Sequence, residues 1–300
     1  MQNKYNWFIS ILASVGLSCI IAKPGASQAL LPYTLDWDGD KLEEQGFELL
    51  QDSIQLAQFQ QYQLAVPYAK LGTRLVPHFY RGWLILGTLS VQQEDLEAGI
   101  AALRRAKLLA PKEEKATIFF TLGSAYFRQE NYNAAVEELE AGLKLEPNTP
   151  EALFDLGNSY FRLEKHGKAL GNYEKAFDQG QEEFWPAINN IGLVKYEQGD
   201  IAGAITDWQT ALDIENEAAE PMLAVAVALY TQGEKDKGLA LGQKALSTDI
   251  RYQELEFLKE NLWGDRLLKD TERFLNTPEM QAALAGIKQQ TPFSVEIIPN

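Results

Sequence analysis

The sequence is poor in the residues that usually mark metal and redox chemistry. It contains one cysteine and two histidines in 300 residues, so no disulfide can form within the chain. The histidines, His78 and His166, have no second His or Cys at the spacing that a zinc site requires. We therefore expect two solvated turn residues, no metal site and no cofactor.

Positive charge is also scarce. Lys and Arg number 27 against 42 Asp and Glu, for a net charge of -15. Affinity for nucleic acid depends on clustered Lys and Arg, and the densest basic run, Arg104, Arg105 and Lys107, is short and lies among acidic neighbours. This run predicts a solvated helix face, and nucleic acid is excluded as an expected partner.

Sequence motifs for catalysis are absent as well. The chain has no G-x-S-x-G, no P-loop and no G-x-G-x-x-G. Its adjacent acids, such as Glu137 with Glu138 and Glu182 with Glu183, are typical of the outer face of a helix. We expect no catalytic residue; an enzyme with an unmarked site in a groove is the alternative from another functional class.

The N-terminus carries the longest apolar stretch, Trp7 to Ala22, which has no charged residue. As a helix it would be about 24 Å long, which is short for a hydrocarbon core of about 30 Å. It suits the apolar region of a secretory signal, with Lys4 before it and small residues near Ser27 where a peptidase could cut. Residues 1–30 are therefore a cleaved signal peptide or a retained membrane anchor, with residues 5–22 in the membrane.

Two features near this stretch suggest chemistry that the residues do not support. Cys19 lacks the Leu three residues before it that lipoprotein signals carry, so we interpret it as a small hydrophobe. In the polar link 31–45, alternating aspartates from Asp36 to Asp40 resemble a calcium loop. Lys41 and Phe47, however, stand where the loop needs a Gly and a bidentate Glu. We expect an acidic linker or a helix N-cap.

The rest of the chain is similar to itself at a spacing of 34 residues, the separation of Gly123 and Gly157, each preceded by Leu. The other matching residues are Tyr126, Ala135, Leu139, Gly142 and Pro147 in the unit 116–149, and Tyr160, Ala169, Tyr173 and Ala176 in the unit 150–183. Units 80–113 and 185–218 keep most of this pattern, and units 46–79 and 219–252 keep less of it. Such a period is typical of a helical repeat array.

Each unit can be explained as two helices joined by a short polar turn. A glycine such as Gly123 lets the second helix approach closely, and Ala135 answers as a small residue from that helix. Three turns end in Asp95, Asn131 and Asp200, which are suitable N-caps. Thr149 and Pro150 predict an N-cap and a first helical position for the next unit.

These residues, in the order Trp, Leu-Gly, Tyr, Ala, Phe, Ala and Pro, resemble the tetratricopeptide-repeat (TPR) family. The resemblance implies an all-α, right-handed superhelical solenoid of about six repeats at 46–252. An apolar N-terminal helix would precede it. Residues 253–288 are expected to form C-terminal capping helices, with Trp263 as an anchor, and residues 289–300 a loose tail.

In TPR proteins the first helix of each unit lines a concave groove that binds peptides or proteins. Transferred to this chain, the groove positions are Phe120, Ser124, Phe127, Arg128, Phe154, Asn158, Phe161, Arg162, Tyr196 and Tyr230. Either the aromatic rings pack between repeats, or they hold apolar side chains of a partner while the arginines meet its carboxylates or backbone oxygens. Some TPR proteins bind the acidic tails of chaperones through Lys and Asn. Here Phe154 replaces that Lys beside Asn158, which argues against a chaperone tail.

The ending, with Leu-Trp-Gly-Asp-Arg-Leu-Leu and Thr-Glu-Arg-Phe-Leu-Asn-Thr-Pro, gives a narrower resemblance. The layout is similar to membrane-linked TPR proteins of cyanobacteria and chloroplasts, one of which partners the light-dependent protochlorophyllide oxidoreductase. It implies an assembly or stabilising factor, anchored at a thylakoid or plasma membrane, for a chlorophyll-synthesis or photosynthetic protein. The alternative is an exported scaffold in the periplasm or lumen that serves envelope or secretion machinery.

Overall fold

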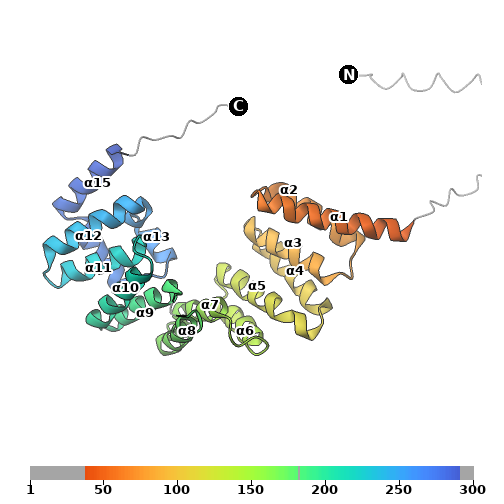
Figure 1. Cartoon of the computed structure of the whole chain (residues 1–300), viewed down its shortest axis with the longest axis horizontal. Helices are drawn as coiled ribbons and strands as arrows, with labels where there is room; N and C mark the ends of the chain where they lie inside the picture. The colour runs from red at the N-terminus through yellow and green to blue at the C-terminus, as the bar shows by residue number, and fades with distance from the viewer. Residues whose placement is uncertain (1–37, 182, 291–300) are drawn as a thin grey trace, which may run out of the picture. The chain divides into compact units, whose positions relative to one another are not determined.

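The computed structural model describes residues 38–181 and 183–290, and over these residues it contains fifteen α-helices, two 3-10 turns and no strand (Figure 1). The chain divides into Met1–Gly39 and Asp40–Asn300, and the hairpins below belong to the second unit apart from Gly39, the first residue of α1. The predicted apolar N-terminal helix and most of the predicted tail lie outside the described residues. Within the described part of the chain, no helix is both long and apolar enough to cross a membrane.

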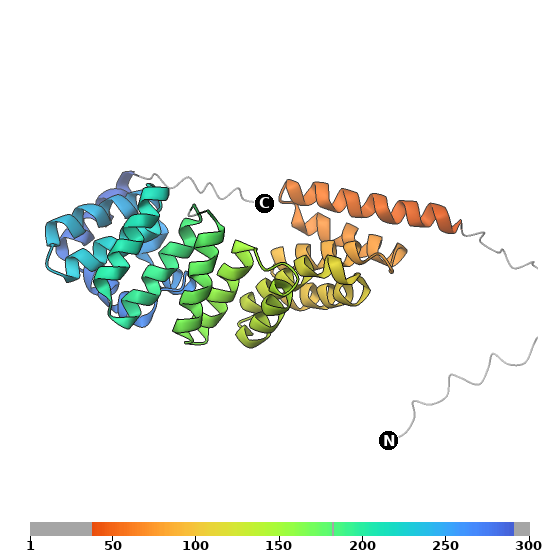
Figure 2. The same ribbon diagram turned by 60° about the horizontal axis from the view of Figure 1, so that its bottom comes forward.

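Twelve of the helices form six consecutive hairpins, which follow one another in chain order (Figures 1 and 2). They are α1 (Gly39–Gln58) with α2 (Tyr62–Leu75), α3 (Tyr80–Gln92) with α4 (Leu96–Leu109), α5 (Lys115–Arg128) with α6 (Tyr132–Leu143), α7 (Pro150–Arg162) with α8 (His166–Gln179), α9 (Trp185–Gln198) with α10 (Ile201–Ile214), and α11 (Ala219–Thr231) with α12 (Lys235–Thr248). The all-α fold of paired helices is therefore confirmed.

The two helices of a hairpin touch at a glycine of the first helix. A Cβ at Gly123 would lie 2.5 Å from Cγ of Leu139, and one at Gly157 would lie 2.5 Å from the ring of Tyr173. At Gly192 the ring of Trp208 occupies the same place at 2.5 Å. Since real Cβ atoms do not come this close to other atoms, a side chain at these positions would force the helices apart. The predicted close contact is confirmed.

The turns inside the hairpins share one construction. The residue before the N-cap has a positive φ in all six hairpins, at Gln60, Glu94, Glu130, Glu164, Gly199 and Gly233. The predicted N-caps Asp95, Asn131 and Asp200 accept hydrogen bonds from backbone amides three residues later. Thr149 occupies the N-cap position of α7, but its hydroxyl donates back to the carbonyl of Glu146 instead.

The prediction of a linker at residues 31–45 is wrong for residues 39–45. Helix α1 begins at Gly39 and runs for 20 residues, so residues 39–45 are helical. Asp40 lies in the first turn of α1, where a negative charge interacts favourably with the helix dipole. Leu42 is half-buried and continues the series of Leu49 and Leu56 at intervals of seven. Because the repeat pattern starts only at residue 46, it does not predict this N-terminal extension of α1.

The C-terminal helices are α13 (Leu255–Glu260), α14 (Asp265–Leu275) and α15 (Pro278–Gln290), preceded by the 3-10 turn η2 (Ile250–Gln253). Helix α15 packs on α12, as expected of a cap on the last hairpin. Helix α14 instead lies on α9 and α11, the first helices of the fifth and sixth hairpins. This placement determines which part of the predicted groove is available.

We expect Gly123→Leu to destabilise the protein by about 3 kcal/mol or more, because the new side chain must displace Leu139. The matched control is Gly171→Leu in α8, where a Cβ meets nothing within 4 Å. Chemical denaturation followed by circular dichroism measures both. Equal midpoints for Gly123→Leu and wild type would contradict the packing described here.

Candidate functional site

The first helices of the hairpins form one face. Helix α3 contacts α5, and α5 contacts α7, in addition to their contacts within hairpins. We call the surface formed by α1, α3, α5, α7, α9 and α11 the first-helix face. All ten predicted partner-binding residues lie on these helices. The structure shows what nine of them touch within the chain, and whether any of the ten binds a partner stays a prediction.

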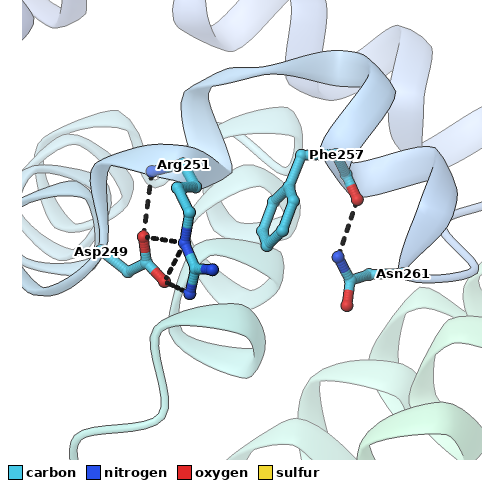
Figure 3. A network of polar contacts seen from close by, with 4 residues as sticks. All are labelled: Asp249, Arg251, Phe257 and Asn261. Atoms are coloured by element: carbon cyan, nitrogen blue, oxygen red, sulfur yellow. Dashed lines mark hydrogen bonds and ion pairs between the residues drawn. The ribbon is translucent and has the colours of Figure 1, made fainter. Parts of the chain in front are cut away.

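The C-terminal half of the first-helix face is occupied by the chain itself. Residues 255–275, here called the C-terminal segment, comprise α13, α14 and the turn between them. Just before this segment, Asp249 accepts hydrogen bonds from the amide and the guanidinium of Arg251 (Figure 3). The Arg251 guanidinium lies over the ring of Phe257, and Asn261 donates to the Phe257 carbonyl (Figure 3).

Arg162, predicted to meet a partner, binds this segment. Its Nη2 donates to the carbonyl oxygens of Lys259, at 2.9 Å, and of Glu260, at 3.2 Å. These are the last residues of α13, whose carbonyls have no partner within the helix. Arg128, one repeat earlier, donates from Nη1 to the carbonyl of Val91 near the end of α3, at 2.7 Å. One interpretation expected both arginines to bind backbone oxygens of a partner. In the structure they bind backbone oxygens of this chain instead.

Glu197 binds the beginning of α14. Its carboxylate accepts hydrogen bonds from the amides of Arg266, at 3.1 Å, and Leu267, at 3.0 Å. The free amides and the positive end of the dipole make a helix N-terminus a favourable site for a carboxylate. A Cβ at Gly264 would lie 2.3 Å from Cδ of Glu197, so the approach requires a glycine at this position.

The predicted tyrosines also serve the C-terminal segment. The hydroxyl of Tyr196 donates to Asp270 at 2.8 Å, and Arg266 lies over the Tyr196 ring. Burial, followed by the hydrogen bond to Asp270, raises the pKa of the Tyr196 phenol. The ring of Tyr230 packs edge-on against Phe274, with centroids 5.2 Å apart. Neither tyrosine presents an open ring to a partner in this state.

Trp263 anchors the segment, as predicted. Its ring is buried, and Nε1 donates to the carboxylate of Glu220 in α11 at 3.0 Å. Burial raises the pKa of Glu220 from 4.5 to about 7, although hydrogen bonds from Trp263 and Asn189 oppose the shift. Near pH 7 the Glu220 carboxyl group is therefore protonated, and so neutral, in about half of the molecules.

Asn158 lies at the head of a buried amide chain. Its Oδ1 accepts from the Tyr173 hydroxyl at 2.8 Å and from Nδ2 of Asn190 at 3.0 Å. Asn189 in turn donates to Oδ1 of Asn190 at 3.2 Å. Because buried polar groups need partners, these contacts join α7, α8 and α9. The oxygen that was expected to orient a bound backbone is used inside the protein.

The four phenylalanines pack within the protein. Phe120 lies against Gly142, and Phe154 lies between the rings of Tyr173 and Phe184. Phe127 packs on Tyr132 and Phe161 on His166, and both also contact the C-terminal core, which contains Leu258, Leu262 and Trp263. The packing interpretation therefore describes their contacts. His166 is half-buried rather than a solvated turn residue, because the Phe161 ring covers it.

Among the described residues, no other segment packs over the N-terminal half of the first-helix face. Phe47 and Ile54 of α1 are 40% and 42% exposed, and Leu84, Thr88, Thr117 and Ser124 continue the face on α3 and α5. We call these six residues the open section; of the predicted site, it includes Ser124. Transferring the TPR groove positions to the first two units as well would have predicted Phe47, Ile54, Leu84 and Thr88 as groove residues.

Little in the described ranges points to catalysis. No three His, Cys, Asp or Glu residues of 38–181 and 183–290 lie together so that they could hold a metal ion. Asp155 in α7 has its pKa raised to about 6, by burial and then by the charge of Glu151. Both acids of this pair lie on one helix, one turn apart.

We expect Glu220→Gln to alter how stability depends on pH. Between about pH 4.5 and 7 the unfolded chain has lost the Glu220 proton while the folded chain keeps it, so the wild type loses stability as pH rises. The amide still accepts from Trp263 but does not titrate. The variant should therefore gain up to about 3 kcal/mol on the wild type between pH 5 and pH 8. Denaturant midpoints at each pH measure this, and a difference that does not change with pH would contradict it.

We expect Glu197→Ala to loosen the start of α14, because two amides lose their carboxylate acceptor. Hydrogen exchange of residues 265–268 should become about tenfold faster, as befits a loss of about 1–2 kcal/mol in local stability. The control is Glu146→Ala, an exposed acid outside the segment. Unchanged exchange in the Glu197 variant would show that the segment is held without this contact.

Comparison with known proteins agrees with this architecture. A sequence model of the TPR repeat matches residues 123–164 and 192–233. The photosystem I assembly protein Ycf3 of Prochlorococcus marinus strain SARG is 33% identical over 132 residues, which is 43% of this chain and 75% of that protein. The Ycf3 of Prochlorococcus marinus strain MIT 9211 is 32% identical over the same length.

Solved structures show the same fold. PilW, a type IV pilus biogenesis factor, has a TM-score of 0.62 at 14% identity and covers 80% of this chain and 98% of its own. A MamA structure has a TM-score of 0.52 at 23% identity and covers 59% and 95%. Proteins built from such repeats bind peptides or other proteins and are generally scaffolds without catalysis. By its repeats, its hairpin packing and these relatives, the chain belongs to the tetratricopeptide-repeat family and is a scaffold for protein interaction.

Proposed function

We propose that this protein is a membrane-linked, non-catalytic assembly factor that holds a segment of a photosynthetic protein on its open section. The observation that carries the proposal is the division of the first-helix face. Its C-terminal half is filled by residues 255–275, while Phe47 and Ile54 remain exposed at the other end. A partner segment has room only on the N-terminal half.

The C-terminal segment indicates what kind of ligand the face suits. Helix α14 lies across α9 and α11, and two side chains bind backbone groups at helix ends of the segment: Arg162 at the end of α13 and Glu197 at the start of α14. Arg128 offers the same chemistry beside Ser124, although Val91 uses one of its nitrogens. A helical segment of a partner is therefore the ligand that this surface favours.

The open section also limits the partner's chemistry. Phe47, Ile54 and Leu84 offer apolar contact, and Thr88, Thr117 and Ser124 offer hydroxyl groups. Arg81, at the edge of this section, is already paired with Glu114. The surface therefore suits an amphipathic segment with an apolar stripe, and it has no cluster of cations for an acidic tail.

Similarity to Ycf3 supports the photosynthetic part of the proposal. Ycf3, similar over 132 residues at 33% identity, is named as a photosystem I assembly protein. The ending of this chain favours a chlorophyll-synthesis enzyme as a second kind of client, because it resembles membrane-linked TPR proteins of cyanobacteria and chloroplasts. Residues 1–30 are proposed to remain as the anchor that keeps the repeats beside such membrane clients. Recovery of mature protein that begins near residue 30 would support the exported scaffold instead.

We expect the open section to determine which clients are recovered. Full-length protein with Ile54→Arg and Ser124→Arg should capture at least about tenfold less photosystem I subunit from solubilised membranes, because two charged side chains enter the apolar surface. Quantitative immunoblots against photosystem I subunits and protochlorophyllide oxidoreductase measure the recovery.

The matched control is Leu108→Arg, since Leu108 is 74% exposed on α4 and outside the first-helix face. It should recover clients as the wild type does. Equal recovery by the open-section variant would exclude this surface. Recovery of neither client by the wild type would refute the photosynthetic assembly function.

A further inference from the structure

The first hairpin carries almost all the exposed large apolar side chains of the described residues. Six of the seven are Phe47, Ile54, Phe59, Leu64, Tyr68 and Leu71, and the seventh is Leu108. Phe47 and Ile54 belong to the open section. Leu64, Tyr68 and Leu71 are 55%, 41% and 48% exposed, and their spacing of four and three residues places them in one stripe on α2.

No other hairpin has such a stripe. At the positions of Leu64, Tyr68 and Leu71 the other five units carry Ala98, Ala102 and Arg105; Ala134, Glu138 and Ala141; Lys168, Asn172 and Lys175; Gly203, Asp207 and Thr210; and Lys237, Leu241 and Lys244. These sets are small, polar or charged, with one leucine among fifteen residues. The stripe is therefore particular to the first unit and is not required by the repeat.

Contacts in the inner units show which direction this stripe faces. Glu138, the counterpart of Tyr68, pairs with Lys107 of the preceding hairpin at 2.7 Å. Asn172 and Lys175, counterparts of Tyr68 and Leu71 one unit later, line one hollow with Leu143 of the preceding hairpin. In the inner units, this surface lies against the repeat before it.

The first helix contributes to the same surface. Tyr126 and Tyr160 reach back to Arg104 and Glu140 of the preceding hairpins, and their counterpart in α1 is Leu56. Leu49 lies seven residues, or two helical turns, before Leu56 on the same side of α1, and it is also half-buried. We call Leu49, Leu56, Leu64, Tyr68 and Leu71 the end face. A terminal repeat normally presents a polar outer surface, and here it is apolar.

The charge around the end face indicates what covers it. No charged residue occurs between Asp52 and Lys70, in a chain that is 23% charged with a net charge of -15. The cores of protein interfaces are depleted of charge, and two strongly acidic copies repel each other least where charge is absent. The lack of Lys and Arg here also disfavours an anionic membrane surface, to which cations would bind.

The opposite end of the repeat array is already covered, because α15 packs on α12. Head-to-tail association would need that end to be open, whereas pairing two identical end faces gives a closed, two-fold dimer. We infer that the end face is a homodimer interface, in which two copies of the chain pack their first hairpins together through Leu64, Tyr68 and Leu71.

Cysteine cross-linking of the full-length chain in detergent tests the geometry. In a Cys19→Ser background, Leu64→Cys, Tyr68→Cys and Leu71→Cys are oxidised separately. If the two-fold axis passes through the stripe, at least one of the three positions should bring its two Cα atoms within about 7 Å, the range in which disulfides form. Leu108→Cys, which is more exposed than the three test positions but lies outside the end face, is the control. Cross-linking no faster at the three positions than at Leu108 would overturn the inference.

A second measurement uses the double variant Leu64→Gln with Leu71→Gln, whose changes lie at exposed positions and preserve side-chain length. Molar mass by light scattering should show a dimer for the wild type and for Leu108→Gln, with a dissociation constant at least about tenfold weaker in the double variant. Far-ultraviolet circular dichroism confirms that helix content is retained. A monomeric wild type, an unaffected double variant, or a dimer lost only on removing residues 1–30 would each overturn the proposed interface.

Discussion

The close approach of two helices at a glycine is the contact on which the other features depend. Where Gly123 or Gly157 meets Leu139 or the Tyr173 ring, the rotation of both helices is set, because a one-residue shift would bring a Cβ into that ring. Setting the rotation also decides which residues face outward. The first-helix face, the end face and the contacts between hairpins all follow from this packing.

A surface formed in this way can bind helices, and the chain uses half of it for its own C-terminal segment. Arg162, Glu197 and Glu220 bind that segment as they would bind a ligand: the first two bind helix ends, and Glu220 accepts a hydrogen bond from the buried indole of Trp263. The same residues would otherwise be interpreted as a peptide site. Whether a part of this face is a groove or belongs to the core depends on whether residues 255–275 lie on it.

Local features were predictable and long-range ones were not. The hairpins, Asp95 and Asn131 as N-caps and the glycine contacts follow from residues within a single repeat unit. The hydrogen-bond partners of Arg162 and Tyr196 are 97 and 74 positions away in the sequence. A repeat period does not predict pairs at such separations. The start of α1 was misplaced for another reason, since the repeat pattern begins at residue 46 while helix-forming residues begin earlier.

The separation between Arg162 and the carbonyls it binds has a consequence during synthesis. A ribosome releases the chain from the N-terminus, so the fourth to sixth hairpins emerge before residues 255–275 exist outside the exit tunnel. During that interval Arg162, Glu197 and Glu220 lack the partners they hold in the finished protein. The nascent array thus presents a more open surface than the mature one, with both polar and apolar side chains uncovered, and its last three repeats acquire their final stability only when translation is nearly complete.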